Sequence, residues 1–404
     1  MAVDRDFDIC VVGGAGHVGL PLALVFARAG QRVLIFDLNQ AAMETIRRGV
    51  MPFVEYGAEP LLAAALRDDR LGFTSEAADL ARAGTVIVAV GTPVDEYLNP
   101  KLRALLDVFR NIRPHLHPDQ TIVIRSTVFP RTCRSVRRLL AQNGGEWHVA
   151  YCPERIAQGY AIRELDELPQ IVSGCTPAAA ARASALFRLV APQVIELDVE
   201  EAELAKLFTN AWRYIQFAAA NQFYMIAQGI GVDFNRVRKA MVDGYGRAAS
   251  LPSAGFAAGP CLLKDTMQLA AFNANSFSLG YAAMAINEGL PAFLVEMLKQ
   301  RHRLEETRVG ILGMAFKADI DDIRDSLSYK LGKVLRFHGA DVSYSDEFAR
   351  DPTFITKEAL VEQCDVVIVG VPHSAYRRLA VPPRVEVVDL WGVIGRAAPA
   401  PVAG

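Results

Sequence analysis

In the stretch "VVGGAGHVGLPLALVF", residues 11–26, three glycines lie between an apolar run and an amphipathic run. Their spacing is Gly14-x-Gly16-x-x-Gly19. The apolar run predicts a buried strand, and the run after the glycines predicts a helix. Glycine suits these positions because the turn is tight and the backbone must approach a pyrophosphate without a Cβ in the way. The helix N-terminus offers free N–H groups to the phosphates. The stretch therefore predicts a dinucleotide-binding turn that includes His17 and Val18.

An acidic residue follows at the distance that ribose recognition requires. Asp37 ends the next apolar run, "RVLIFD" (32–37). A carboxylate at this place accepts hydrogen bonds from a ribose diol and repels a 2′-phosphate, so the pattern favours NAD over NADP. Two alternatives use the same glycines. One is a turn that holds no ligand, and the other is an FAD site, although the sequence carries no second flavin signature.

Strand–helix alternation extends through most of the chain. Further buried strands are expected at 85–92, 120–127, 148–152 and 169–174, an apolar helical run covers 199–229, and alternation returns at 308. Such alternation is typical of a parallel, doubly wound sheet. The sequence thus predicts an α/β protein in which a helical middle domain (198–305) with a long central helix joins two Rossmann-like domains (1–197 and 306–404).

Composition narrows the class of protein. With 404 residues the chain is too long for a single hydrophobic core, so more than one domain is expected. Its net charge of −2 gives no reason to expect nucleic acid as a partner. No apolar run reaches the roughly 18 residues of a membrane span. The six cysteines lie far apart, which argues against disulfides and a metal site and predicts a reducing cytoplasm. The long apolar helix predicts a homodimer interface.

A thiol lies in the stretch "GFAAGPCLLKD", residues 255–265. Pro260 suits the first turn of a helix, so Cys261 is expected at a helix N-terminus, where the dipole favours the thiolate. Lys264 and Asp265 follow at i+3 and i+4, on the same face as the thiol. This pattern fits a nucleophile with a cation and a carboxylate beside it. It fits equally a small buried cysteine ahead of a surface ion pair.

A polar stripe runs along the long helix. Glu203, Lys206, Asn210 and Arg213 recur at steps of three and four residues on a helix that is otherwise apolar. Burying a lysine without a partner is costly, so such a stripe normally faces solvent or a functional site. By itself the stripe is more typical of a solvated face.

Seven motifs in order carry a resemblance that covers nearly the whole chain. They are the glycine stretch, "AVGTP" (89–93), "STVFPRT" (126–132), "CPERIAQGYAIREL" (152–165), "ELAKLFTNAW" (203–212), the thiol stretch and "GMAFKADIDDIRDS" (313–326). With these motifs the chain resembles the nucleotide-sugar 6-dehydrogenases, the UDP-glucose/GDP-mannose dehydrogenase family. Such enzymes oxidise the C6 alcohol of a sugar to a carboxylate in two NAD-dependent steps, and the expected substrate is UDP-glucose or a UDP-N-acetylhexosamine.

The resemblance implies catalytic roles. Cys261 is implied to trap the C6 aldehyde as a thiohemiacetal, and Lys206 and Asn210 to hold the C6 oxygen and stabilise charge on it. Asp265, with Thr127 through a bound water, is the implied proton acceptor. Glu154 is implied to activate the hydrolytic water. Without the resemblance, Thr127 would be interpreted as a strand-end hydroxyl and Glu154 as part of a loop salt bridge.

The resemblance also implies binding residues. Those for NAD, beyond the glycine loop and Asp37, are Gly91, Thr92, Pro93, Ser126, Thr127 and Lys264. Those for the sugar nucleotide, beyond Glu154, Lys206 and Asn210, are Arg155, Arg247, Gly255, Phe316, Lys317 and Arg324. Lys317 and Arg324 are expected on the pyrophosphate oxygens, and Arg247 is expected to reach the sugar nucleotide across a dimer interface.

Three departures leave the sugar open. UDP-glucose enzymes typically have GGxC before KD, whereas this chain has Ala258-Gly259-Pro260-Cys261. "CPER" and "IDDIRDS" are more similar to the UDP-N-acetylhexosamine branch, and "LLKD" to the UDP-glucose branch. dTDP- and GDP-hexoses are further alternatives, as is a two-electron 3-hydroxyacid dehydrogenase, which needs neither Cys261 nor a third domain.

Overall fold

A computed structural model describes residues 5–92, 94–95 and 101–394 of the chain. The chain divides into two compact units. Unit 1 contains residues 1–209 and 267–275, and unit 2 contains residues 210–266 and 276–404. Pro93, which the sequence assigned to the cofactor site, lies outside the described residues.

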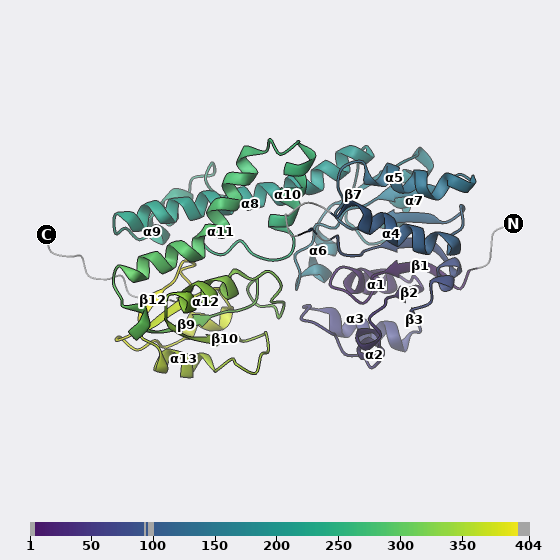
Figure 1. Ribbon diagram of the computed structural model, residues 1–404. Helices are drawn as coiled ribbons and strands as arrows, with labels where there is room; N and C mark the ends of the chain where they lie inside the picture. The colour runs from purple at the N-terminus through teal and green to yellow at the C-terminus, as the bar shows by residue number, and fades with distance from the viewer. Residues whose placement is uncertain (1–4, 93, 96–100, 395–404) are drawn as a thin grey trace. The chain divides into compact units, whose positions relative to one another are not determined.

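Unit 1 is built on an eight-stranded sheet with the order β3-β2-β1-β4-β5-β6-β7-β8 (Figure 1). The order reverses between β1 and β4, which makes the carboxyl ends of these strands the expected dinucleotide site. The strands are β1 (Phe7–Val12), β2 (Val33–Phe36), β3 (Leu71–Thr74), β4 (Ala83–Val88), β5 (Thr121–Ile124), β6 (His148–Tyr151), β7 (Gln170–Gly174) and β8 (Val194–Glu196). The helices are α1 (Gly19–Arg28), α2 (Gln40–Arg47), α3 (Ala58–Arg67), α4 (Leu102–Ile112), α5 (Thr132–Leu140), α6 (Ala161–Glu167) and α7 (Pro177–Phe187).

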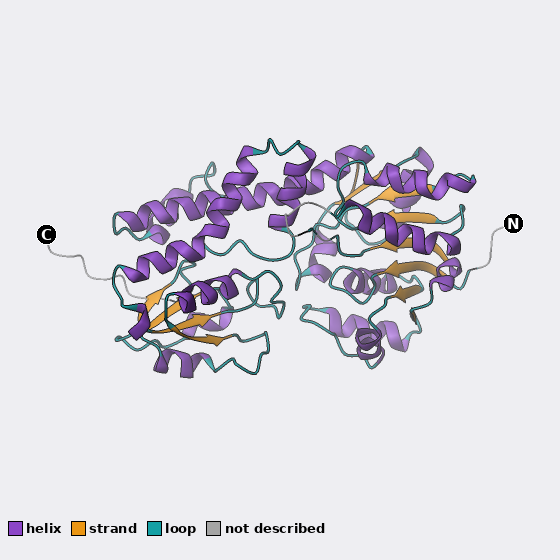
Figure 2. Ribbon diagram, viewed as in Figure 1, coloured by secondary structure: helices purple, strands orange, loops and turns teal. Residues whose placement is uncertain are grey.

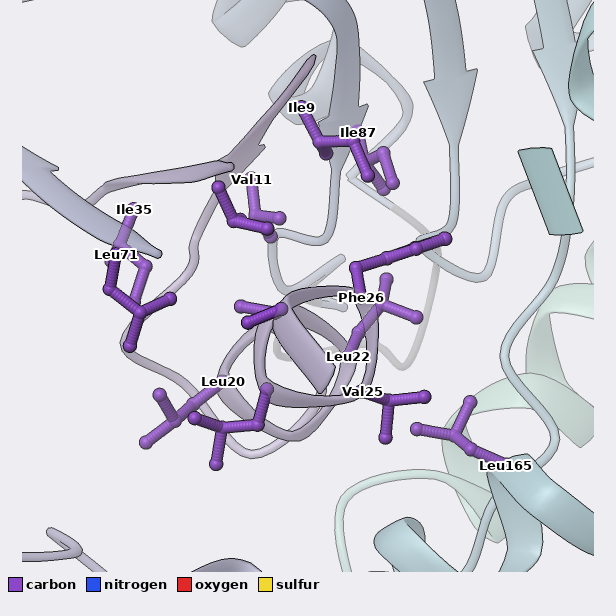
Figure 3. Close-up of a cluster of buried hydrophobic side chains, with 14 of the residues drawn as sticks. Ile9, Val11, Leu20, Leu22, Val25, Phe26, Ile35, Leu71, Ile87 and Leu165 are labelled. Atoms are coloured by element: carbon purple, nitrogen blue, oxygen red, sulfur yellow. The ribbon is translucent and has the colours of Figure 1, made fainter. Parts of the chain in front are cut away.

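The central strands of this sheet bury both of their faces. In β1, Ile9 and Val11 pack into one hydrophobic cluster, while Cys10 and Val12 pack into a second. Successive side chains of a strand point to opposite faces, so each face of the sheet has a core of its own. Figure 3 shows the first cluster, where the side chains of α1 meet those of β1 and β2. This two-sided burial explains the continuous apolar runs of the sequence and confirms the predicted doubly wound class.

The sheet departs from a purely parallel arrangement at one pair of strands. β7 runs antiparallel to β6, with Tyr151 opposite Ser173. The connection contains only α6, whose seven residues span about 10 Å. Such a short helix does not return the chain to the far end of the sheet, so β7 starts near the edge at which β6 ends.

Helix α8 (Val199–Gly229) has 31 residues, as the sequence predicted, and contributes to both units. The other helices after it are α9 (Phe234–Val242), α10 (Leu262–Phe272), α11 (Ser278–Lys299), α12 (Leu327–Phe337) and α13 (Lys357–Gln363). Figure 2 shows that helices and loops form the chain between β8 and β9.

Unit 2 contains a second sheet, which is entirely parallel and has the order β10-β9-β11-β12. Its strands are β9 (Arg308–Leu312), β10 (Asp341–Ser345), β11 (Val366–Val369) and β12 (Glu386–Val388). Gly310 lies inside β9. A Cβ at Gly310 would lie 2.3 Å from Leu360 of α13, so this glycine serves helix packing rather than a ligand loop.

Asp346, directly after β10, makes the stability of unit 2 depend on pH in the acid range. Burial acts against ionisation of its carboxyl, but hydrogen bonds from His373 and from backbone amides lower its pKa to about 2. A carboxyl with a lowered pKa in the folded state stabilises the fold above its unfolded pKa and loses that contribution as the pH falls. The total contribution is about 2 kcal/mol.

We therefore predict that Asp346→Asn removes part of the acid dependence of unfolding. Between pH 6 and pH 3 the wild-type chain should lose about 1 kcal/mol more stability than the variant, measured by urea unfolding. Asp341→Asn is the matched control, because Asp341 is an exposed aspartate at the start of the same strand, β10. Parallel acid profiles for the wild type and Asp346→Asn would contradict the assignment.

Candidate active site

The glycine loop connects β1 to α1, as the sequence predicted, and its glycines differ in what they do. A Cβ at Gly19 would lie 2.2 Å from the carbonyl oxygen of Gly13, and one at Gly14 would lie 2.7 Å from that of Val11. These two glycines are needed by the fold itself. Among the described residues beyond its chain neighbours, a Cβ at Gly16 would meet only the carbonyl oxygen of Gly13, at 3.5 Å, so these residues leave this face of the loop open. That opening fits the close approach of a pyrophosphate to the backbone.

Asp37 follows β2 and is bound to the same loop. Its Oδ2 accepts the N–H of Ala15 at 3.0 Å, and its Oδ1 accepts the N–H of Asn39 at 2.9 Å. A carboxylate has about four lone-pair sites, so two acceptor positions are left for a ribose diol. The residues present therefore fit NAD.

Other predicted cofactor residues lie at the same edge of the sheet. Gly91 and Thr92 follow β4, and Ser126 and Thr127 follow β5. Ser126 is fixed there because its hydroxyl donates to the carbonyl of Val90 at 2.7 Å. Thr127 is half-buried, directly beyond Ser126.

The four residues of the polar stripe of α8 lie in three different environments. Glu203 is fully buried and accepts the N–H groups of Arg131 (2.6 Å) and Cys133 (2.9 Å) at the start of α5. It is a structural cap, and burial raises the pKa of its carboxyl. Lys206 and Asn210 are each 5% exposed, whereas Arg213 is exposed. The interpretation of the stripe as one solvated face is therefore wrong for all members except Arg213.

Lys206 faces the "CPER" segment after β6. Its Nζ lies 3.8 Å from Oε2 of Glu154. Oε1 of Glu154 is buried and has no hydrogen-bond partner within the described part of the chain. A buried carboxylate oxygen without a partner is costly unless a ligand or water occupies the place opposite.

Two buried side chains hold this segment. Arg125 donates to the carbonyl of Cys152 at 3.2 Å, and Gln170 donates to that of Pro153 at 3.1 Å. Burial lowers the pKa of Arg125. Arg155 donates to the carbonyl of Pro169, which fixes the arginine next to Glu154. Neither Arg125 nor Gln170 was predicted from the sequence, because their partners are backbone atoms 27 and 17 residues away.

In unit 2, Cys261 directly precedes α10, and its carbonyl accepts the N–H of Asp265 at 2.8 Å. This is the helix N-terminus that the sequence predicted. Cys261 is exposed, whereas the other cysteines are buried or half-buried. Burial raises the pKa of Cys152 to about 12 and that of Cys175 to about 11, so both thiols stay protonated at neutral pH.

Asp265 connects this helix to α8. It is fully buried and accepts the amide of Asn210 at 2.5 Å, and its Oδ1 lies 3.1 Å from Nζ of Lys264. Asn210 and Asp265, both of which the resemblance assigned to catalysis, are thus hydrogen-bonded to each other. The charge pair of Lys264 and Asp265 is not the exposed surface pair of the alternative interpretation.

The segment before the thiol packs against the predicted sugar-nucleotide loop within unit 2. Gly259 donates to the carbonyl of Asp325 at 3.2 Å, and a Cβ on Gly259 would lie 2.5 Å from the ring of Phe316. The side chain of Arg324 is fixed by Asp322, with distances of 2.5–3.0 Å. This hydrogen bonding raises the pKa of Arg324.

Further residues hold the thiol segment. Asn221 on α8 accepts the N–H of Gly255 at 2.8 Å and donates to its carbonyl at 3.0 Å. Asn287 of α11 supports Asn221 at 2.9 Å. No local pattern marks these amides in the sequence, since neither stands in a charged or glycine-rich motif. Arg247 is exposed in the segment after α9.

The first sheet and its glycine loop define the class of the protein as a Rossmann-type dinucleotide-dependent oxidoreductase. Three sequence profiles of the UDP-glucose/GDP-mannose dehydrogenase family match the chain: the NAD-binding domain at 7–191, the central domain at 200–288 and the UDP-binding domain at 310–396. The chain belongs to this family. It is an NAD-dependent dehydrogenase that acts on the CH–OH group of a nucleotide sugar, which confirms the predicted class, cofactor and kind of substrate.

Individual relatives agree with this assignment. The chain is 29% identical over 401 residues to the NDP-N-acetyl-D-galactosaminuronic acid dehydrogenase of Ralstonia nicotianae, with 94% of each chain covered. It is 27% identical to the solved UDP-D-ManNAc dehydrogenase of Pyrococcus horikoshii, with a TM-score of 0.88 and 96% of each chain covered. The UDP-glucose dehydrogenase structure of Pyrobaculum islandicum gives 28% identity and a TM-score of 0.88, covering 97% of this chain and 96% of that one. Over the described ranges, no helix is both long and apolar enough to cross a bilayer.

The two kinds of glycine in the cofactor loop can be separated by experiment. We predict that Gly16→Ala folds normally, within about 0.5 kcal/mol of the wild type, but weakens NAD binding roughly tenfold because its methyl group occupies the phosphate approach. Gly19→Ala is the matched variant and should destabilise unit 1 by about 1–3 kcal/mol through its clash with Gly13. Calorimetric NAD titration and urea unfolding measure both effects. Unchanged NAD affinity in Gly16→Ala would contradict the loop assignment.

Proposed function

We propose that the protein oxidises the C6 hydroxymethyl group of a UDP-N-acetylhexosamine to the uronic acid in a four-electron reaction, with UDP-glucose as the alternative substrate. The single observation that carries the mechanism is the exposed Cys261 at the N-terminus of α10, beside the buried Asn210–Asp265 pair. The N-acetylhexosamine is favoured by the "CPER" and "IDDIRDS" segments and by relatives named for N-acetylated sugars.

The first oxidation converts the alcohol to an aldehyde. The hydroxyl proton passes to Asp265, with Thr127 acting through a bound water, and Lys206 and Asn210 hold the C6 oxygen. NAD, which the glycine loop, Asp37 and Lys264 would bind, would accept the hydride in each of the two oxidations. The reaction therefore consumes two molecules of NAD per sugar.

The second oxidation passes through an intermediate that is covalently bound to Cys261. The Cys261 thiolate adds to the aldehyde carbon and forms a thiohemiacetal, whose oxygen takes the developing negative charge. Loss of hydride from that carbon leaves a thioester. Water, activated by Glu154, attacks the thioester carbonyl, the C–S bond breaks, and the acid and the free thiolate form. Lys206 lies 3.8 Å from Glu154 and stabilises both the carboxylate and the tetrahedral oxygen.

The sugar nucleotide is bound by charge and by backbone shape. We propose that Lys317 and Arg324 bind the diphosphate, that Phe316 and Gly255 border the sugar, and that Arg155 acts beside Glu154. The predicted segments 1–197, 198–305 and 306–404 then serve as the cofactor domain, the connecting domain and the nucleotide-sugar domain. The cytoplasmic location stays a prediction.

The covalent step predicts a selective loss in Cys261→Ala. Acid formation should fall roughly a thousandfold or more, because no thioester can form, while NAD binding is unchanged. Cys175→Ala is the control, since this thiol is half-buried and burial raises its pKa to about 11. Acid is measured by chromatography of the product, and two NADH should form per sugar in the wild type.

Three results decide between the proposals. A ratio near one NADH per sugar would favour the two-electron hydroxyacid-type reaction. Full acid formation by Cys261→Ala would refute the covalent step. A panel of UDP-glucose, UDP-N-acetylglucosamine, UDP-N-acetylmannosamine, dTDP-glucose and GDP-mannose, followed by absorbance of the reduced cofactor, identifies the sugar and the nucleotide.

We also propose that the chain is a homodimer through the middle segment. Phe208, Trp212, Phe223 and Ile226 are exposed on α8 at steps of 4, 11 and 3 residues, which keeps them on one face of a helix with 3.6 residues per turn. Trp212 is 58% exposed and Ile226 is 60% exposed. Exposed large apolar side chains gathered on one face are typical of a protein interface. In such a dimer we expect Arg247 to reach the partner's sugar nucleotide.

The interface proposal predicts that Trp212→Glu combined with Ile226→Glu yields a folded monomer. Two buried charges would prevent association, and the mass by light scattering should fall to that of one chain, about 44 kDa. Phe337→Glu is the control, because Phe337 is also a large exposed apolar residue (85% exposed) but lies on α12. A wild-type chain that is already monomeric would rule out the interface.

A further inference from the structure

A fully buried histidine lies at the carboxyl edge of the second sheet, at some distance along the chain from every residue assigned above. His373 follows β11, and neither its side chain nor that of Asp346 after β10 is exposed. The loop that carries Phe316 and Lys317 leaves β9 at the same edge, because β9 runs parallel to both β10 and β11. Neighbouring parallel strands thus bring the histidine, the aspartate and this loop together.

The hydrogen bonds of His373 define its protonation. Its Nδ1 accepts the backbone N–H of Asp319 at 2.9 Å, and its Nε2 lies 3.1 Å from Oδ2 of Asp346. A backbone N–H can only donate, so Nδ1 carries no proton and Nε2–H donates to Asp346. The rings of Phe348 and Tyr376 enclose the imidazole, with centroids 5.0 and 5.4 Å away.

Asp346 fixes the first end of the loop. Its Oδ2 also accepts the N–H groups of Met314 (2.6 Å) and Ala315 (2.9 Å). Its Oδ1 accepts those of Phe348 and Ala349, both at 2.8 Å. The carboxylate therefore ties the start of the loop to the segment after β10.

His373 and its neighbour fix the other end. Asp319 has a φ of 58°, a left-handed conformation that costs energy for a residue other than glycine. Its backbone N–H is bound by His373, and its Oδ1 accepts the N–H of Ser374 at 2.8 Å. Between the two fixed ends lie Phe316, which packs on Gly259 near the thiol, and Lys317.

We infer that His373 and Asp346 are positioning residues that hold residues 314–319 in the conformation that binds the diphosphate of the sugar nucleotide. This inference rests on the proposed function of Phe316 and Lys317. His373 and Asp346 touch neither the substrate nor the cofactor. They act through the loop, and their loss should weaken nucleotide binding rather than slow the chemical step.

The two hydrogen bonds of His373 can be removed separately. His373→Asn keeps an acceptor near the position of Nδ1 and loses the donor to Asp346. His373→Gln keeps a donor that reaches Asp346 and loses the acceptor for Asp319. His373→Phe loses both. We expect the Kd for UDP and the KM for the sugar nucleotide to rise about tenfold in His373→Phe and less in the two amides, with kcat within about twofold of the wild type.

If the histidine variants do not fold, a variant that removes a single hydrogen bond of the loop can test the inference instead. Ser374→Pro removes only the N–H that donates to Asp319, because residue 374 is the first of a short 3-10 helix, where proline is tolerated. His373 has φ −58° and ψ 140°, which suit a residue before proline. This variant should raise the Kd for UDP about threefold.

His302→Gln is the matched control, because His302 also contacts a carboxylate of unit 2, that of Glu386 at 2.7 Å. It should leave the Kd for UDP and KM unchanged. NAD affinity should be unchanged in every variant. If His373→Phe folds and its Kd for UDP equals that of the wild type, the inference is overturned. If His373→Phe does not fold, an unchanged Kd for UDP in Ser374→Pro overturns it. By contrast, failure of the wild-type chain to reduce NAD with any nucleotide sugar would refute the proposed function instead.

Discussion

The hydrogen bond from Asn210 to Asp265 is the contact on which the candidate site depends. Both side chains are almost completely removed from solvent, and the distance is 2.5 Å. A buried carboxylate is costly unless donors surround it, so Asp265 requires the amide on α8 and the ammonium of Lys264. The same bond sets the rotation of α10 against α8. Because Cys261 stands at the start of α10, the place of the thiol follows from this pair.

Much of this arrangement could be predicted from the sequence, since its signals are local. The strand, glycine loop and helix at 11–26, the length of α8 and the helix after Pro260 each depend on residues close together in the chain. The pairing of Asn210 with Asp265 could not be derived from spacing, because 55 residues separate them. The resemblance to a known family assigned both residues to one catalytic site but did not predict the hydrogen bond between them.

The sequence failed where a polar side chain serves the backbone of a distant segment. Glu203 looked like part of a solvated stripe, yet it caps α5 across 70 residues of chain. Asn221 binds both backbone groups of Gly255, and Gln170 binds the "CPER" segment, without any local pattern that marks them. Such residues satisfy buried N–H and C=O groups, a requirement that exists only after the chain has folded. Helical periodicity alone cannot distinguish them from surface residues.

The two sheets use the acid after their second strand in opposite ways. In the first sheet Gly13 donates to Phe36 and Asp37 accepts Ala15, and in the second Gly313 donates to Ser345 and Asp346 accepts Met314 and Ala315. Asp37 is partly exposed and accepts two amides, which leaves room for a ribose diol. Asp346 is buried and accepts four amides and the imidazole of His373, so its lone pairs are fully used. The second sheet thus has the same Rossmann-like connection, but its carboxylate serves as an anchor for the loop. A dinucleotide cannot bind there as it does in the first sheet, because the acceptor that selects the ribose is already occupied by the protein.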